Sequence, residues 1–163
     1  MKVIHPLKPI YNEYSRILIL GTMPSIKSRE EGFYYALPKN RFWKVLSQVY
    51  QEEIGTTKKE KIDFLFRHHI ALFDVLKSCD ISASEDNSIK NPIPNNFSHI
   101  LKTSHITTIF TTGKKAYQLY QKYCYPKTKI KAILLPSTSP ANCKKGIEEI
   151  LYKEYKQIKQ YTE

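Results

Sequence analysis

One short segment constrains the fold of this chain more than any other. Residues 16–21 read RILILG, four aliphatic residues in a row that stop at a glycine. A strand with one face in solvent alternates apolar and polar side chains, whereas a strand covered on both faces is apolar along its length. The segment therefore predicts a central strand with helices packed on both sides of its sheet.

Strand and helix patterns then alternate along the chain. Apolar or β-branched runs predict further strands at residues 71–75, 106–111 and 130–135. Apolar residues at helical spacing predict helices that begin near Asn40, cover residues 58–69, run from Asn95 or Asn96 to residue 101, follow Gly113, and cover residues 144–161 with Ile150 inward.

This alternation implies a parallel sheet with both faces covered, and 163 residues suit one domain. The predicted fold is a three-layer α/β/α sandwich around a central, mainly parallel four-stranded sheet, formed by a single domain over residues 1–163.

Three polar stretches are predicted to be loops. Residues 22–39 are interrupted by proline and glycine, residues 78–91 are rich in Ser, Asp and Asn, and Asp86 within the latter is predicted to be a turn residue. Residues 136–142 read PSTSPAN. In parallel sheets ligands bind beyond the carboxyl ends of the strands. The loops at 22–39 and 136–142 are therefore the candidate site.

The composition is ordinary except for its charge. Hydrophobic residues make up 41% and charged residues 25%, which excludes a disordered or collagen-like chain. No membrane span or secretory signal is recognisable, so a cytoplasmic location is expected. The net charge of +11 makes nucleic acid the first hypothesis for a partner, with lysines that only maintain solubility as the alternative.

The cysteines predict neither a disulfide framework nor a metal site. Cys79, Cys124 and Cys143 are odd in number and widely spaced, and an iron–sulfur cluster needs four ligands. The adjacent His68 and His69 cannot both bind one metal from a helix face. The phosphate-binding patterns GxxxxGK[ST] and GxGxxG are also absent, so neither a metal nor a cofactor is expected.

Aromatic and cationic residues gather in the second half of the first loop. Residues 32–43 read GFYYALPKNRFW, with five aromatic residues, two cations and one amide. Aromatic faces stack on nucleobases, and cations meet phosphates. Packing in the core is the competing interpretation for the tyrosines.

Together these segments resemble the uracil-DNA glycosylase superfamily, most closely its hypoxanthine-DNA (deoxyinosine) glycosylase branch and next the mismatch-specific uracil/thymine glycosylases. The resemblance rests on residues 21–24 (GTMP), 34–36 (YYA), 38–43 (PKNRFW) and 135–142 (LPSTSPAN), in the family order and spacing. It implies a monofunctional enzyme that flips a deaminated base, hypoxanthine or uracil, out of DNA and hydrolyses its bond to the sugar. The implied partner is DNA, bound by a monomer.

The resemblance also assigns the catalytic residue. Mismatch-specific relatives hold the attacking water with an asparagine in the first loop, where this chain has Met23. In the deoxyinosine branch an asparagine that precedes the aromatic pair of the second motif takes that role, which is Asn40 here. A carboxamide can orient a water without deprotonating it. A plain helix cap is the alternative for Asn40.

Base-binding residues follow from the same resemblance. Tyr35 occupies the position whose ring stacks on the flipped base, with Tyr34 behind it. Backbone groups of Gly21, Thr22 and Met23 would bond the base edge, and Pro24 fixes the turn.

The 136–142 loop resembles the one that meets DNA and fills the space left by the flipped base. Ser137 and Ser139 are expected to bind phosphates, while Thr138, Pro140 or Ala141 is expected to lie nearest the duplex. The implied DNA-binding set continues through Asn142 to Lys144, which with Lys145 is expected to begin the following helix.

Several observations keep other functions open. Ser25 stands where the family has glycine and Leu37 where it has histidine, which favours a non-catalytic module that binds damaged or mismatched DNA. A lyase would need a lysine in a site motif, and only Lys39 qualifies.

Asp74, at a predicted strand end, is either a site carboxylate or a loop cap. The Gly113–Lys115 turn, residues 113–115, is either a phosphate site or a solvated lysine pair.

Overall fold

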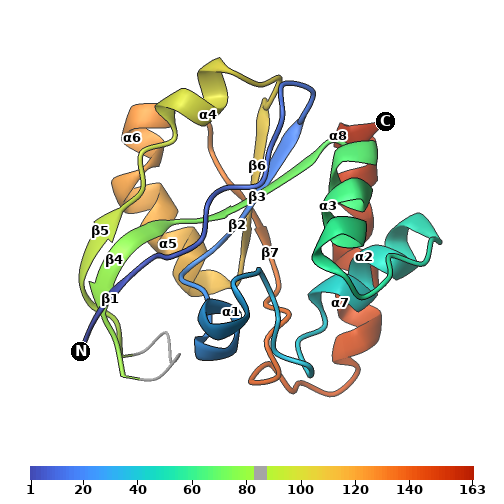
Figure 1. The fold of residues 1–163 in the computed structure, drawn as a ribbon, viewed down its shortest axis with the longest axis horizontal. Coiled ribbons are helices and arrows are strands. Elements are labelled where there is room, and N and C mark those ends of the chain that lie inside the picture. Colours follow the sequence, from blue (N-terminus) through green and yellow to red (C-terminus); the bar gives the residue numbers. More distant parts are fainter. Residues whose placement is uncertain (83–87) are drawn as a thin grey trace.

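A computed structural model describes residues 1–82 and 88–163, so the predicted turn at Asp86 lies outside the described residues. Its centre is a four-stranded parallel sheet in the order β3-β2-β6-β7 (Figure 1). The strands are β2 Ile17–Gly21, β3 Ile70–Asp74, β6 Thr108–Thr112 and β7 Ile133–Leu135. The predicted sheet is confirmed.

Strand β2 is the innermost element, as its sequence predicts. All five of its residues are buried, and so are all five of β3. Ile17 pairs with Ile70 on one side and with Thr108 on the other. Because the strands are parallel and in this register, Gly21, Asp74 and Thr112 all lie at one edge of the sheet, where the carboxyl ends of their strands meet.

Helices cover both faces, which gives the three predicted layers (Figure 1). One face carries α2 Phe42–Tyr50, α3 Lys58–Arg67, α7 Ile147–Tyr155, the 3₁₀ turn η2 Lys156–Ile158 and α8 Lys159–Thr162. The other carries α4 Ser98–Lys102, α5 Lys114–Tyr123 and α6 Tyr125–Thr128. In the part of the chain that the structure describes, no helix is long and apolar enough to cross a membrane.

A second, smaller sheet was not predicted. Strands β1 Lys2–Ile4, β4 Leu76–Asp80 and β5 Lys90–Pro94 form an antiparallel sheet in the order β1-β4-β5. The prediction of a continuous loop over 78–91 is therefore wrong at both ends. Strand β5 reads KNPIP, and prolines are compatible with a strand only at a sheet edge, so its sequence pattern resembles a loop.

The first long loop contains a short helix, α1 Ile26–Glu31. Ser25 caps its start by accepting a hydrogen bond from the Ser28 N–H, and Gly32 ends it in a left-handed conformation with φ of 72°. The serine that departs from the family pattern thus has a local structural role.

Two predicted boundaries are wrong for identifiable reasons. Strand β7 begins at Ile133 and not at Ile130, because the Ile130 carbonyl accepts from the Tyr120 hydroxyl and the Ala132 N–H donates to Gln121. Helix α7 begins at Ile147, after Gly146 at a φ of 73°. Lys144 and Lys145 therefore precede the helix, and Ile150, which was predicted to face inward, is 39% exposed.

Candidate active site at the carboxyl edge of the sheet

Three polar side chains converge on the end of β2. A Cβ built on Gly21 would lie 2.7 Å from Asp74 Oδ1, 3.2 Å from the Tyr35 hydroxyl oxygen and 3.6 Å from Thr112 Oγ1. These residues come from the ends of three neighbouring strands and from the loop after α1. We call Gly21, Tyr35, Asp74 and Thr112 the Gly21 cluster. Only glycine lets the three polar groups approach the backbone this closely.

Tyr35 reaches the cluster with its hydroxyl. Its backbone has a φ of 54°, and its ring stacks on Phe42 with centroids 3.9 Å apart and planes 14° apart. The hydroxyl is buried and makes no hydrogen bond of good geometry to the described residues. Burial, reinforced by the negative charge of Asp74, raises the pKa of the phenol, so the group stays protonated. A base that stacked on Tyr35 would have to use the ring face opposite Phe42.

Asp74 is held by a residue that the sequence analysis did not select. Its Oδ2 lies 2.7 Å from His5 Nε2, and both side chains are almost completely buried. His5 Nδ1 accepts from the Leu7 N–H. Because a backbone N–H can only donate, Nδ1 is unprotonated, and Nε2–H is the donor to Asp74. The sequence analysis left Asp74 as either a site carboxylate or a loop cap. The structure places its carboxylate inside the Gly21 cluster.

The first loop is tied to the chain that follows β3. The carbonyls of Gly21 and Thr22 accept from the N–H groups of Val75 and Leu76. Pro24 is buried and Met23 is half-buried. Backbone contacts from this loop to a base, as predicted, would therefore have to come from N–H groups or from the second lone pairs of these carbonyls.

The carboxamide oxygen of Asn40 accepts a hydrogen bond within the protein, whereas its nitrogen is available as a donor. Oδ1 accepts from the N–H of Phe42, the first residue of α2, although the N-cap position itself is Arg41, whose side chain makes no capping hydrogen bond. Among the described residues, nothing accepts from Asn40 Nδ2. The hydrogen bond to Phe42 thus uses the oxygen and leaves the nitrogen as a donor to water.

Arg41 joins the second and third motifs. Its backbone N–H donates to the Thr138 carbonyl, and its Nη1 donates to the carbonyls of Ser139 and Asn142 at 3.2 and 3.1 Å. Figure 1 shows the loop before α2 beside the loop before α7 at the same edge of the sheet. Two segments that are about 100 residues apart in sequence are therefore fastened together by one side chain.

The 136–142 loop is folded by its own hydroxyl groups. Ser137 Oγ accepts from the Ser139 N–H, and Ser139 Oγ accepts from the Ala141 N–H. The Asn142 side chain donates to the Ser137 carbonyl, which closes the turn. From the core, the Tyr155 hydroxyl donates to the Pro136 carbonyl at 2.7 Å. The loop is thus a preformed surface.

Exposure separates the residues predicted to meet DNA. Ala141 and Lys144 are exposed, and Ser137, Ser139, Pro140 and Asn142 are partly so. Thr138 is only 2% exposed, so in this conformation it does not lie nearest a duplex, contrary to one option in the sequence-based prediction. Gly113, at a φ of 92°, lies close to Ser137, since a Cβ built on it would be 3.4 Å from Ser137 Cβ.

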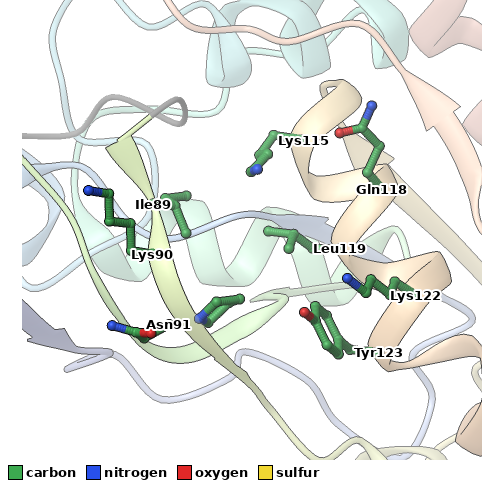
Figure 2. Close-up of a pocket in the computed structure, with 9 residues that line it drawn as sticks. Ile89, Lys90, Asn91, Lys115, Gln118, Leu119, Lys122 and Tyr123 are labelled. Carbon is green, nitrogen blue, oxygen red and sulfur yellow. The ribbon is translucent and has the colours of Figure 1, made fainter.

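A separate hollow lies away from these residues. It has a volume of about 580 Å³ and lies between β5 and α5, lined by Ile89, Lys90, Asn91, Pro92, Lys115, Gln118, Leu119, Lys122 and Tyr123 (Figure 2). Lysines from both elements border it, and its described lining has no carboxylate or histidine. It shares no residue with the predicted site. The carboxylate of Asp74, the hydroxyl of Tyr35 and the carboxamide of Asn40 lie instead at the carboxyl edge of the sheet.

Of the adjacent histidines, His68 has a structural partner, whereas the buried Nδ1 of His69 makes no hydrogen bond to the described residues. His68 lies 3.1 Å from Glu52, which also pairs with Arg67, and this group ties the end of α3 to the segment after α2. The three cysteines, all within the described residues, form no disulfide.

Comparison with known proteins assigns the family. Residues 9–161 match the model of the uracil DNA glycosylase superfamily, and the chain belongs to that superfamily. It is 33% identical over 111 residues to the hypoxanthine DNA glycosylase of Methanosarcina barkeri, covering 66% of this chain and 70% of that protein. It is 31% identical over 137 residues to the protein of the same name from Methanosarcina acetivorans, covering 82% of this chain and 84% of the relative.

A solved structure agrees with this assignment. The solution NMR structure of a candidate uracil DNA glycosylase from Methanosarcina acetivorans superposes with a TM-score of 0.80 at 26% identity, covering 97% of this chain and 99% of that one. Family and relatives together support a DNA glycosylase.

Sequence analysis missed three contributors to this site. His5 stands next to Pro6 in no recognisable motif, and Thr112 reads as an ordinary strand residue. Arg41 lies within a recognised motif, but only the structure reveals which carbonyls it binds. The strand-end position of Thr112 is the one signal that could have selected it.

Proposed function

We propose that this protein is a monofunctional DNA glycosylase that removes deaminated bases, hypoxanthine foremost, from DNA and leaves an abasic site. The observation that carries the proposal is the meeting of three motifs at one edge of the sheet: the end of β2, the Tyr35–Asn40 stretch at residues 35–40, and the 136–142 loop. The names of the two Methanosarcina relatives support hypoxanthine as the substrate.

The reaction needs few groups. A water oxygen bonds to C1′ of the deoxyribose while the C1′–N bond breaks, and its electron pair leaves with the base. The water gives up a proton and the departing base takes one up. Since the transition state joins a cationic sugar to an anionic base, fixed dipoles and a positioned water supply the catalysis.

Asn40 positions the water in this scheme. Its Oδ1 is fixed by the Phe42 N–H, which sets the direction of the carboxamide, and its Nδ2–H donates to the water oxygen. This leaves a water lone pair for attack. Tyr35 offers one ring face to the flipped base, because Phe42 covers the other.

Binding to DNA follows from charge and from the preformed loop. Flipping a base costs a few kcal/mol, roughly, and stacking returns about 1 to 3 kcal/mol. The 136–142 loop supplies Ala141 and Pro140 to the vacated space, and Ser137, Ser139 and Lys144 to the phosphates. The net charge of +11 strengthens the attraction of any duplex.

The direct test incubates the purified protein with labelled DNA that carries deoxyinosine, deoxyuridine or deoxyxanthosine, followed by alkaline cleavage of abasic sites. We expect strand scission with deoxyinosine and no covalent trapping by borohydride. Tight, salt-dependent binding to lesion DNA without any abasic product would instead establish a non-catalytic module, which the Ser25 and Leu37 departures from the family pattern favour. A trapped covalent complex would establish a lyase.

A further inference from the structure

Negative charge is missing from one long stretch of the chain. Residues 88–147 contain ten lysines and neither Asp nor Glu. Helices α4, α5 and α6, which cover one face of the central sheet, and strand β5 all come from this stretch. None of the ion pairs between described residues involves one of these ten lysines. This face of the molecule therefore carries positive charge that is available to a ligand.

The hollow between β5 and α5 lies on this face and combines lysines with apolar side chains (Figure 2). We call it the α5 groove. Lys90 borders it from β5, and Lys122 borders it from α5. Leu119 is buried and forms its floor, with the half-buried ring of Tyr123 beside it. Lys122 Nζ lies over the Tyr123 ring, 5.1 Å from its centre, so a cation and an aromatic ring adjoin one another.

The α5 groove leads away from the candidate active site. Helix α5 begins directly after Gly113, which lies next to the 136–142 loop, and Lys115 in its first turn lines the groove. A second hollow of about 180 Å³ is bordered by Lys102 of α4 and Lys127 of α6. Its lining residues follow those of the α5 groove along both chain segments. The two hollows therefore form one path that starts near the carboxyl edge of the sheet.

Single-stranded nucleic acid is the ligand that such a groove fits. Cations at its border bind the phosphates of a strand, and an aromatic ring inside it stacks on a base that is not paired. A volume of about 580 Å³ falls within the roughly 300–1,000 Å³ of ligand pockets, so a nucleotide can enter. A duplex keeps its bases stacked between its two backbones, so it could meet the lysines but not the floor.

We propose that the α5 groove binds the single-stranded DNA that flanks the lesion on the same strand. Lys90 and Lys122 bind phosphates, and Tyr123 stacks on a base between them. The choice of DNA as the nucleic acid rests on the proposed function, but binding in the groove does not require excision and is measured without it.

The first experiment measures binding by fluorescence anisotropy, with an undamaged thymidine strand of about 20 nucleotides as the probe, longer than the sites of most single-strand binding domains. Lys90→Gln combined with Lys122→Gln should weaken binding at least fivefold at low salt. Since each phosphate contributes about 0.7 to the slope of log affinity against log salt on a single strand, the slope should fall by about 1.4. An unchanged slope would overturn the proposal.

Lys153→Gln combined with Lys156→Gln is the matched control. It removes the same charge from exposed lysines on the opposite face, and Lys156 Nζ lies 5.1 Å from the centre of the Tyr152 ring, as Lys122 does from Tyr123. The control pair should change the affinity less than twofold. Equal weakening by both pairs would mean that the net charge alone attracts the strand, which would refute a site in the groove.

The ring of Tyr123 is tested separately from the lysines. Tyr123→Leu should weaken single-strand binding at least threefold with the salt slope unchanged, whereas Tyr123→Phe should bind like the wild type. A Tyr123→Leu protein that melts and binds like the wild type would exclude stacking. The lysine pair should change affinity for a blunt duplex less than twofold. An equal loss on the duplex, or on a polyglutamate chain, would assign the groove to that ligand instead.

Excision links the groove to the lesion. With deoxyinosine in a long single strand, the lysine pair should slow excision at least fivefold at subsaturating enzyme and less than twofold at saturation. Shortening the strand on one side of the lesion should abolish this difference, and a difference that persists with both sides shortened would contradict the proposed path. A wild type that binds the strand with the expected slope but excises no hypoxanthine would refute the proposed function and leave the groove as a single-strand site.

Discussion

Gly21 is the residue where the site leaves least room for change. A Cβ there would lie 2.7 Å from Asp74 Oδ1, closer than a Cβ atom approaches a non-bonded atom in proteins. Gly21→Ala should therefore displace the carboxylate, lower the free energy of unfolding by about 1–3 kcal/mol, and slow excision strongly. Urea unfolding and single-turnover assays measure the two effects.

Gly146→Ala is the control for this prediction. Gly146 has a φ of 73° and open space around it, so alanine adds about 1 kcal/mol of backbone strain without a steric clash. The free energy of unfolding of Gly146→Ala should fall by about that amount, but its rate of hypoxanthine excision should stay near that of the wild type. A Gly21→Ala protein with normal activity would show that the Gly21 cluster is not the site.

Two substitutions separate the two tasks of Asn40. Asn40→Asp keeps an oxygen for the Phe42 N–H, so stability should stay within about 0.5 kcal/mol, while loss of the Nδ2 donor should slow excision at least tenfold. Asn40→Ala should lose both activity and about 1 kcal/mol of stability. If the aspartate variant retains full activity, the water is held by another group.

Tyr35→Phe separates the ring of Tyr35 from its hydroxyl. The hydroxyl is buried and makes no hydrogen bond of good geometry to the described residues, so its removal should raise the free energy of unfolding by about 1 kcal/mol. The ring that is predicted to stack on the base remains, and excision should stay within threefold of the wild-type rate. A large loss of activity in a stable protein would mean that the hydroxyl, not the ring, contacts the base.

At the scale of elements, Tyr155 connects the core to the 136–142 loop. It is buried on α7 and donates to the Pro136 carbonyl. Tyr155→Phe should cost about 1–3 kcal/mol, because a buried carbonyl is left without its donor, and should weaken DNA binding by loosening the loop. Thr57→Ala provides the control, since it removes the capping box of α3 at about 1 kcal/mol and should leave the dissociation constant for DNA unchanged.

The elements that sequence reasoning recovered are those whose signal is local. The burial of residues 16–21 can be predicted from that run alone, whereas the short helix α1 lies inside a segment that was predicted to be a loop. The small sheet escaped because β1 pairs with β4 across more than 70 residues and β5 carries two prolines. The start of β7 depends on hydrogen bonds from Tyr120 and Gln121, which no local pattern contains.

The same distinction applies to the site. Motif residues such as Gly21, Tyr35 and Asn40 were found because their neighbours in sequence identify them. His5 acts across 69 residues, and its contact with Asp74 depends on the packing of the smaller sheet against the larger one. Sequence alone therefore predicted the water and base positions but missed the group that orients the carboxylate.

At the scale of the whole molecule, the net positive charge should determine how the affinity for DNA depends on salt. Each phosphate neutralised contributes about 0.9 to the slope of log affinity against log salt. With four phosphates neutralised, affinity for an undamaged duplex should fall on the order of a hundredfold between about 50 and 200 mM salt. Fluorescence anisotropy titrations measure this slope, and a flat salt dependence would remove the excess of lysines from DNA binding.

The hydrogen bonds of Arg41 couple the 136–142 loop to the segment that carries Asn40. A displacement of residues 139–142 by a bound duplex would be transmitted through the guanidinium to the residue directly after Asn40. The rate of base excision should therefore depend on how the phosphates are bound, and DNA with poorly placed phosphates should lose the correct base only slowly.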